Sequence, residues 1–436
     1  MTLLDQIPQP GGVPFSVEEA FARVLDQTDE LAPLRHEFEL PSGENGEPLA
    51  YFLGNSLGPM PKAARREVAQ VLEAWPRHGV EGFTSGRSPW ATYQESFRDS
   101  LARVVGAHPS EVVTMNTLTV NLHAMLASFY RPSGARVKVL MEARAFPSDT
   151  YAVASHLRLR GVDPATGIVL AAPRAGEDSV RTEDIEGLLA EQGPQIALVL
   201  LGGVNYYTGQ CFDMARITAA GHRAGSLVGF DLAHAAGNVP LALHDWDTDF
   251  AVWCSYKYLN GGPGAVGGAY VHRRHGDDPA APRLAGWWGN APATRFAMRP
   301  DFEPDQGAAG WQISTPPILA MAPLRASLAL FDRAGMDPLR RKSESLTGYL
   351  EALLAGISES PLRLLTPTDS AARGCQLSVH YPGHGRWLHQ ALRAEGIVTD
   401  YRDPDVVRLA PAPLFNTYHE VWRAGLAIRQ AVRRAA

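Results

Sequence analysis

Cysteine is scarce in this chain of 436 residues, and its scarcity excludes two kinds of structural support. The three cysteines, Cys211, Cys254 and Cys375, stand far apart, and no CxxC pair occurs. An odd number of isolated cysteines makes neither a disulfide framework nor a cysteine zinc site. We therefore expect no bound metal, and we expect the protein to suit a reducing compartment such as the cytoplasm.

Long apolar runs and an excess of basic residues are also missing. The longest apolar run, about residues 196–201, is far shorter than the roughly 20 residues that span a bilayer. Residues 1–15 lack a basic segment followed by an apolar one, so we expect no secretory signal. The net charge of −6 argues against general nucleic-acid binding. We expect neither a membrane nor a nucleic acid among the partners, and we expect short basic clusters such as 340–342 to be solvated helix faces.

Apolar strand patterns do alternate with helical patterns through most of the chain. Continuous apolar runs at 137–141, 196–201 and 227–230 predict buried strands, and periodic helical segments separate them. This alternation is typical of an α/β fold with a mainly parallel sheet covered on both faces. A helix over 318–334, a second long helix and then short strands, including one at 406–409, predict a smaller α+β domain. We expect three parts: an N-terminal segment, 1–60, that packs with the small domain; a large domain, 61–316; and a connecting helix with the small domain, 317–436.

Polar residues and prolines indicate where helices begin. Ser16 and Thr92 each stand three residues before a glutamate, which is the pattern of a capping box. Pro61 fits the first position of a helix. Thr119 suits the N-cap of the helix that follows the strand predicted at 112–115.

Lys257 is the most informative residue of the sequence. It lies in an apolar, aromatic stretch before a glycine-rich turn, and Asp231 ends an apolar strand pattern 26 residues earlier. Apolar surroundings disfavour the charged ammonium and so favour a nucleophilic amine. Enzymes that use pyridoxal 5'-phosphate (PLP) need a lysine amine for a Schiff base and a carboxylate against the pyridine nitrogen. The pair predicts a PLP site, although a solvated lysine and a capping aspartate are the commoner occurrences of these residue types.

Other segments can be assigned around the same cofactor. Residues 262–267 match GxGxxG, but a strand pattern follows them, so they predict a tight turn near the lysine and not a dinucleotide site. The helix start at 117–121 suits the phosphate, because helix N-termini bind anions. Phe146 could stack on a ring, and Asp149 could be a cap or a second acid. Arg408, a charge inside an apolar strand, is a candidate for capture of a carboxylate.

Together these residues resemble the kynureninase family, one of the fold-type I PLP enzymes in the aminotransferase class V group. The resemblance extends over nearly the whole chain in matching order and spacing. The segments that carry it are 51–58, 118–122, 146–149, 205–209, 231–234, 255–262, 286–289 and 340–343.

The resemblance implies hydrolysis of L-kynurenine, or its 3-hydroxy form, to an anthranilate and L-alanine, in tryptophan degradation, by a homodimer with shared active sites. It implies that Lys257 forms the Schiff base and moves the α-proton, that Asp231 holds the pyridine nitrogen, and that Tyr256 protonates the alanine fragment. The implied cofactor-binding residues are Leu118, Thr119, Phe146, Asp149, Asp231, His234, Tyr256, Lys257, Trp287 and Thr315, with Trp287 and Thr315 from the partner subunit. The implied substrate-binding residues are Asn55, Ser56, Phe83 and Arg408, with Arg408 on the carboxylate.

Three positions depart from parts of the family. Phe83 stands where forms that prefer 3-hydroxykynurenine carry a histidine, and Thr315 stands where those forms carry an asparagine. These two residues predict a preference for unhydroxylated L-kynurenine. Gly202 replaces a small polar residue, which removes one expected cofactor contact.

Two other functions remain open at this point. A cysteine desulfurase of the same fold needs a nucleophilic cysteine on a mobile loop, and Cys375 only opens a predicted strand. A PLP-fold protein that binds a ligand without catalysis predicts the loss of catalytic groups, whereas Lys257, Asp231, Tyr256 and Arg408 are all present.

Overall fold

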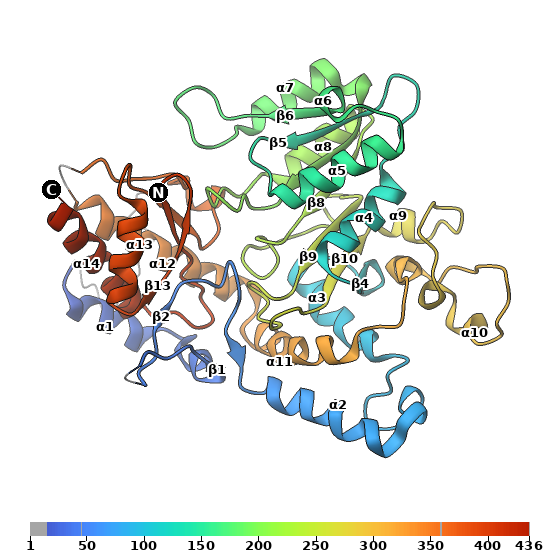
Figure 1. Ribbon diagram of the computed structural model, residues 1–436, viewed down its shortest axis with the longest axis horizontal. Helices are drawn as coiled ribbons and strands as arrows, with labels where there is room; N and C mark the ends of the chain where they lie inside the picture. The colour runs from blue at the N-terminus through green and yellow to red at the C-terminus, as the bar shows by residue number, and fades with distance from the viewer. Residues whose placement is uncertain (1–14, 45, 358–359, 436) are drawn as a thin grey trace.

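A seven-stranded sheet forms the centre of the larger part of the protein in the computed structural model, which describes residues 15–44, 46–357 and 360–435 (Figure 1). Residues 1–14, where no signal was expected, lie outside the described ranges. In spatial order the strands are β4 (Val112–Thr114), β10 (Gly267–Val271), β9 (Phe250–Cys254), β8 (Leu227–Asp231), β7 (Ile196–Gly202), β5 (Lys138–Glu142) and β6 (Ile168–Ala171). Strands β9, β8, β7, β5 and β6 are parallel, and β10 is antiparallel to both of its neighbours. The mainly parallel α/β sheet is confirmed.

The apolar strands bury side chains on both faces of this sheet. Along β7, Val199 and Leu201 belong to one core cluster, whereas Leu198 and Leu200 belong to the other. Such alternation requires a helical layer on each face. Helices α4 (Leu118–Phe129) and α5 (Pro147–Leu159) contribute to one core. Residues of the other core come from α3 (Arg98–Val105), α7 (Thr182–Gln192), α8 (Met214–Arg223) and α11 (Ile318–Ala334). The bounds of α11 match the prediction.

Two strand glycines make room for large aromatic side chains between these layers. A Cβ atom on Gly229 would lie 2.1 Å from the Phe250 ring, and one on Gly268 would lie 2.3 Å from the Trp253 ring. Both rings are fully buried. Any larger residue at either glycine would therefore push an aromatic ring out of the core.

The smaller part is built on an antiparallel four-stranded sheet in the order β11-β12-β15-β14. Its elements are α12 (Met336–Ala355), β11 (Arg363–Leu364), β12 (Leu377–His380), α13 (Gly385–Ala394), β13 (Ile397–Val398), β14 (Asp400–Arg402), β15 (Val406–Leu409) and α14 (Tyr418–Ala435). The N-terminal helix α1 (Glu19–Thr28) packs on α14, and β2 (Ala50–Tyr51) pairs with β13 (Figure 1). The division at residues 60 and 316 stays a prediction.

The remaining elements are short or lie at the edges. They are η3 (Ala32–Glu37), β1 (Phe38–Glu39), β3 (Met60–Pro61), α2 (Ala64–His78), η4 (Gly79–Phe83), η5 (Tyr93–Phe97), η6 (Pro109–Glu111), α6 (Pro164–Gly167), η7 (Gly193–Gln195), α9 (Arg273–Gly276), η8 (Trp287–Gly289), α10 (Pro292–Arg295), η9 (Gly307–Trp311) and η10 (Ser370–Ala372). Among the helices of the described ranges, none combines the length and the apolar character that a bilayer crossing needs.

The two predicted capping boxes did not form. Helix α1 begins at Glu19 with Glu18 as N-cap, and the Ser16 hydroxyl instead accepts a hydrogen bond from the Glu18 N–H at 3.1 Å. Thr92 precedes the 3₁₀ turn η5 and makes no side-chain cap. A hydroxyl can satisfy local turns as well as helix ends, so the pattern alone did not decide between them.

Two other helix starts were also wrong. Pro61 lies in β3, opposite Phe38, and α2 begins three residues later at Ala64. Proline suits such an edge strand because it has no N–H to pair. Thr119 lies inside α4, whose N-cap is Thr117. This shift by two residues places both Leu118 and Thr119 in the first helical turn.

A buried ion pair joins the N-terminal helix to the small domain. The Lys342 Nζ lies 2.7 Å from an Asp29 carboxylate oxygen, and only 6% and 7% of the two side chains are exposed. The expectation of a solvated face at 340–342 was therefore wrong for Lys342. The Lys342 ammonium pairs with the carboxylate of Asp29, the residue that directly follows the end of α1.

We predict that Lys342→Met destabilises the protein by about 3–5 kcal/mol, because it leaves the buried Asp29 carboxylate unpaired. Urea unfolding measures the change. Lys62→Met, which removes an exposed lysine, is the control and should cost less than about 0.5 kcal/mol. Equal stability of the two variants would contradict the importance of the pair.

Candidate active site

A pocket of about 270 Å³ opens where the parallel strands β5, β7 and β8 end. Glu142, Gly202 and Asp231 are the last residues of these strands, and all three line the pocket. Parallel α/β sheets bind ligands beyond the carboxyl ends of their strands. Of the predicted residues, those that line this pocket are Leu118, Thr119, Phe146, Asp149, Asp231, His234, Tyr256 and Lys257.

The loop that follows β9 carries Lys257 into the pocket. The Gly261 N–H donates to the Ser255 carbonyl at 2.7 Å, and the Asn260 N–H donates to the Lys257 carbonyl at 3.0 Å. Gly58 presses against this turn, since a Cβ atom there would lie 2.5 Å from the Lys257 carbonyl oxygen. The Lys257 Nζ lies 5.8 Å from the centre of the Phe146 ring. The loop thus holds a half-buried amine over an aromatic face.

Three buried carboxyl groups lie at the same end of the sheet. Asp231 accepts a hydrogen bond from the Ala233 N–H at 2.7 Å, and both Glu142 oxygens accept from the Gly202 N–H at 3.2 Å. One buried oxygen of Asp149 has no hydrogen-bond partner among the described residues. Burial raises the pKa of all three groups, to about 7 for Glu142, and the Lys257 charge opposes the rise for Asp231 and Asp149. The unpartnered oxygen suits a ligand with a polar hydrogen or a positive charge.

The start of helix α4 forms the opposite wall of the pocket. Its N-cap, Thr117, makes no side-chain cap, so the first N–H groups of α4 have no capping side chain. The Thr119 hydroxyl lies 2.9 Å from that of Ser148, which joins the starts of α4 and α5. An uncapped N-terminus of a 12-residue helix is suited to an anion such as a phosphate.

Two neutral groups complete the wall around the amine. Burial lowers the pKa of His234 well below its usual range, with the charges of Lys257 and Arg408 acting in the same direction. Burial also raises the pKa of Tyr256 above its usual value. His234 is therefore an uncharged imidazole and Tyr256 a protonated phenol at neutral pH.

Arg408 and Asn55 connect to the pocket through the backbone of Tyr206, which lines it. Arg408 Nη1 donates to the Tyr206 carbonyl at 2.6 Å, and Gln376 Nε2 donates to the same oxygen at 3.0 Å. Gln376 in turn accepts from Asn55 at 2.8 Å. The Asn55 side-chain oxygen, Oδ1, is buried without a partner among the described residues.

Ser56 is half-buried beside Asn55, and its N–H donates to the Leu53 carbonyl. Neither residue, nor Arg408, is among the described residues that line the pocket. Asn55, Ser56 and Arg408, which were predicted to bind the substrate, thus lie outside the lining of the pocket.

Phe83, Trp287 and Thr315 are not among the described residues that line the Lys257 pocket. The Phe83 ring contacts that of Trp288 at 6.3 Å between centroids, and Trp287, whose ring also contacts Trp288, is 46% exposed. Thr315 lines a cavity of about 330 Å³ that shares Thr117 with the Lys257 pocket. None of the three thus joins the lysine in the lining of one pocket of the same chain.

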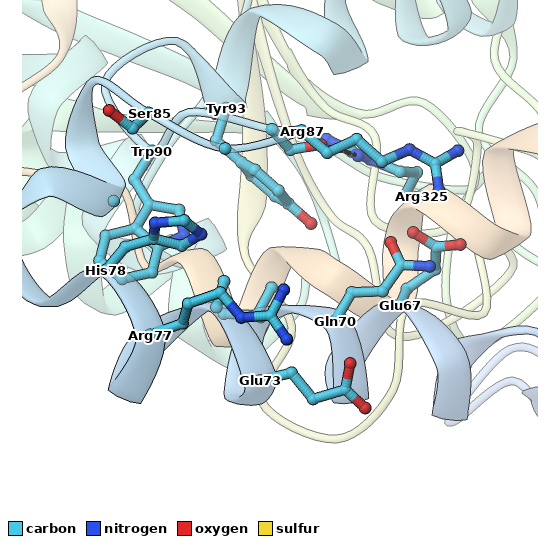
Figure 2. A pocket seen from close by; sticks show the side chains of 15 residues that line it. Glu67, Gln70, Glu73, Arg77, His78, Ser85, Arg87, Trp90, Tyr93 and Arg325 are labelled. Carbon is cyan, nitrogen blue, oxygen red and sulfur yellow. Dashed lines mark hydrogen bonds between the residues drawn. The ribbon is translucent and has the colours of Figure 1, made fainter.

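Another cavity, of about 220 Å³, lies between α2 and residues 82–93 (Figure 2). Figure 2 shows Arg77 and Arg325 on its walls with Glu67 and Glu73. None of the predicted cofactor residues lines it. Arg87 is a third arginine of its lining, so three positive charges face two negative ones, and no lysine is among the described residues that line it.

The cysteines are poorly placed for nucleophilic chemistry. Cys254 and Cys375 are buried, and burial raises the pKa of Cys375 to about 12 and that of Cys211 to about 11. A reactive thiol needs a lowered pKa and access to solvent. The structure gives no support to the desulfurase alternative.

Three residues of this region were missed by the sequence analysis. Glu142 ends β5 as Asp231 ends β8, so the strand-end rule that found Asp231 applies to it as well. Tyr206 accepts the Arg408 hydrogen bond through its backbone carbonyl, and a backbone contact does not depend on the residue type that a sequence shows. Asp400 pairs with Arg408 across β14 and β15, a contact that depends on strand register.

Comparison with known proteins agrees with the geometry of the pocket. A family model described as the kynureninase C-terminal domain matches residues 339–428. The kynureninase of Myxococcus xanthus is 53% identical over 409 residues, with 94% of this chain and 96% of that protein covered. The kynureninase of Salinispora tropica is 53% identical over 420 residues, with 95% and 97% covered.

Solved structures with low identity share the fold. A cysteine desulfurase from Escherichia coli superposes with a TM-score of 0.73 at 19% identity, covering 93% of this chain and 99% of that one. The cystine C–S lyase C-DES gives a TM-score of 0.72 at 20% identity, covering 87% and 97%. These similarities concern the fold alone, whereas the identity to the bacterial proteins extends over more than nine-tenths of each chain. The chain belongs to the kynureninase family.

Proposed function

We propose that this enzyme hydrolyses L-kynurenine to anthranilate and L-alanine, with PLP bound in the Lys257 pocket. The observation that carries the proposal is the meeting of Lys257, the buried Asp231 and the uncapped start of α4 in one pocket. A kynureninase needs an amine, a carboxylate and an anion cradle around one ring. The family relationship supplies the substrate class.

The residues present fit the cofactor. The N–H groups of Leu118 and Thr119 suit the phosphate, and Phe146 suits the face of the ring. The buried carboxylate of Asp231 would hold the protonated pyridine nitrogen, with Asp149 beside it. PLP, when bound, withdraws electrons from the substrate carbons next to the amine.

Water is the second substrate, because its oxygen ends in the anthranilate carboxyl group when the Cβ–Cγ bond breaks. Side chains of this chain move the protons. The Lys257 amine holds the cofactor and then, once released, takes the α-proton of the substrate. We assign the return of a proton to the alanine fragment to the Tyr256 phenol, which lines the pocket with Lys257 and whose pKa burial raises. His234 stays uncharged at neutral pH, so it adds no positive charge that would make the Lys257 amine a weaker base.

Substrate recognition is assigned to the wall behind the pocket. Arg408 receives the substrate carboxylate, and Asn55 and Ser56 flank it. Phe83 offers the aromatic ring of the substrate an apolar neighbour without a hydrogen-bond partner for a 3-hydroxyl group. A site without that partner gives no advantage to the hydroxylated substrate, which favours L-kynurenine.

The active enzyme is proposed to be a cytoplasmic homodimer whose sites are shared. The Phe83 and Trp287 rings both contact Trp288, and neither they nor Thr315 are among the described residues that line the Lys257 pocket of the same chain. A two-fold axis would bring this group against the pocket of the other subunit. The three unpaired cysteines suit a reducing compartment.

We predict that the PLP-loaded enzyme forms anthranilate from L-kynurenine and that Lys257→Ala lowers kcat by roughly 1,000-fold or more. Anthranilate fluorescence measures the rate, and the exposed Lys62→Ala is the control. The kcat/KM for 3-hydroxykynurenine should be lower than that for L-kynurenine. Absence of anthranilate together with sulfide release from L-cysteine would contradict the assignment and restore the desulfurase.

We predict that two inactive variants restore each other if the site is shared. Lys257→Ala and Trp287→Ala each impair their own homodimers. A mixed dimer holds one site with both changes and one with neither, so random exchange of subunits should recover about a quarter of wild-type activity. Light scattering establishes the dimer first. No recovery after proven exchange would show that Trp287 serves the site of its own chain.

A further inference from the structure

The Asp400 carboxylate binds one edge of the Arg408 guanidinium group. The two residues face each other across the antiparallel pair β14 and β15. Arg408 Nε donates to Asp400 Oδ1 at 2.8 Å, and Nη2 donates to Oδ2. This side-on, two-point contact fixes the plane and the direction of the group.

Two N–H bonds of the guanidinium have no acceptor among the described residues. A guanidinium carries five N–H bonds, of which Asp400 takes two and the Tyr206 carbonyl takes one. Each of Nη1 and Nη2 therefore keeps one N–H bond. The bond left on Nη2 points away from the edge that Asp400 occupies, because the group is planar.

The charges of this cluster also suit an incoming anion. Arg408 is almost fully buried, and a buried cation without a counter-charge is costly. Asp400 supplies that counter-charge before a ligand arrives. Arg402 also contacts Asp400, at 3.2 Å, so two arginines share one carboxylate. The three side chains together keep one positive charge, which a substrate carboxylate can neutralise.

The cluster reaches the pocket through Tyr206. The Tyr206 carbonyl binds Arg408, and the Tyr206 ring meets the Phe146 ring at 5.2 Å. Phe146 lies against the Lys257 amine. Asp400 stands on the other side of Arg408, on the small-domain strand β14. It can therefore act on the substrate only through the arginine.

We propose that Asp400 is a positioning residue, which holds Arg408 so that its remaining N–H bonds receive the α-carboxylate of the substrate. The inference rests on the proposed function, because it needs an amino-acid substrate in the Lys257 pocket. Asp400 would thus take an indirect part in substrate binding, through Arg408.

The test compares Asp400→Ala and Asp400→Asn with Asp403→Asn, which removes a carboxylate that is 85% exposed three residues away. Without the two hydrogen bonds to Asp400, the Arg408 guanidinium is no longer held in one orientation, and substrate binding weakens. We expect the KM for L-kynurenine to rise by about 10- to 100-fold in Asp400→Ala, with kcat within about threefold of wild type. Asp400→Asn, which keeps the shape and one acceptor, should fall between, and Asp403→Asn should match wild type.

A second readout separates positioning from a general loss of structure. L-Alanine and L-alaninamide differ only at the carboxylate, and calorimetry gives the Kd of each for the PLP-loaded protein. The Asp400 variants should bind L-alanine about 10-fold or more weakly and L-alaninamide as wild type does. Equal weakening of both ligands, or a fall in kcat with unchanged KM, would overturn the proposal.

Two outcomes keep the inference distinct from the proposed function. Failure of the wild-type enzyme to form anthranilate refutes the proposed function itself. A wild-type enzyme that is active, with an unchanged KM in the Asp400 variants, refutes only the role of Asp400. If Asp400→Ala does not fold, the isosteric Asp400→Asn decides the matter by the same two measurements.

Discussion

The attraction between the Lys257 amine and the buried carboxyl groups of Asp231 and Asp149 is the interaction on which the site depends. Burial raises the pKa of both acids, and the charges of Asp231 and Glu142 raise that of Asp149 further. The Ala233 N–H lowers the pKa of Asp231, and the lysine charge acts against the rise in both acids. The parallel sheet imposes this juxtaposition, because strands β8 and β5 end at the same edge and β9 leads into the lysine loop. The other residues that line the pocket, such as Phe146 and His234, surround these charged groups.

A second constraint comes from the small domain, which closes the site from behind. The Tyr206 carbonyl, at the end of the large domain's pocket wall, accepts hydrogen bonds from Arg408 and Gln376. Both donors belong to the small-domain part of the chain. The N-terminal segment contributes Gly58 against the lysine turn and Asn55 against Gln376. The residues proposed to bind the cofactor and those proposed to bind the substrate therefore belong to different parts of the chain, which meet at Tyr206.

The sequence predicted the parts of this arrangement that local patterns determine. Continuous apolar runs located β7 and β15, and periodicity located α11 with its bounds, because burial on a sheet or helix face leaves such patterns. The patterns also predicted a strand end at Asp231 and a helix start near Leu118, as the structure has them. The helix starts predicted at Ser16 and Pro61 were wrong, because the same residue types also serve turns and edge strands. Glu142 received no role although it ends a strand as Asp231 does, whereas the pairing of Asp400 with Arg408 depends on strand register, which local patterns do not give.

The most direct test of the central claim is to locate the cofactor on the chain. Borohydride reduction of the PLP-loaded protein makes the link between cofactor and lysine permanent, and mass spectrometry of the peptides identifies the modified residue. The account predicts one modification per chain, on Lys257, and its loss in Asp231→Ala protein that no longer retains PLP. A modification at another lysine, or none in a protein that is fully active on L-kynurenine, would contradict it.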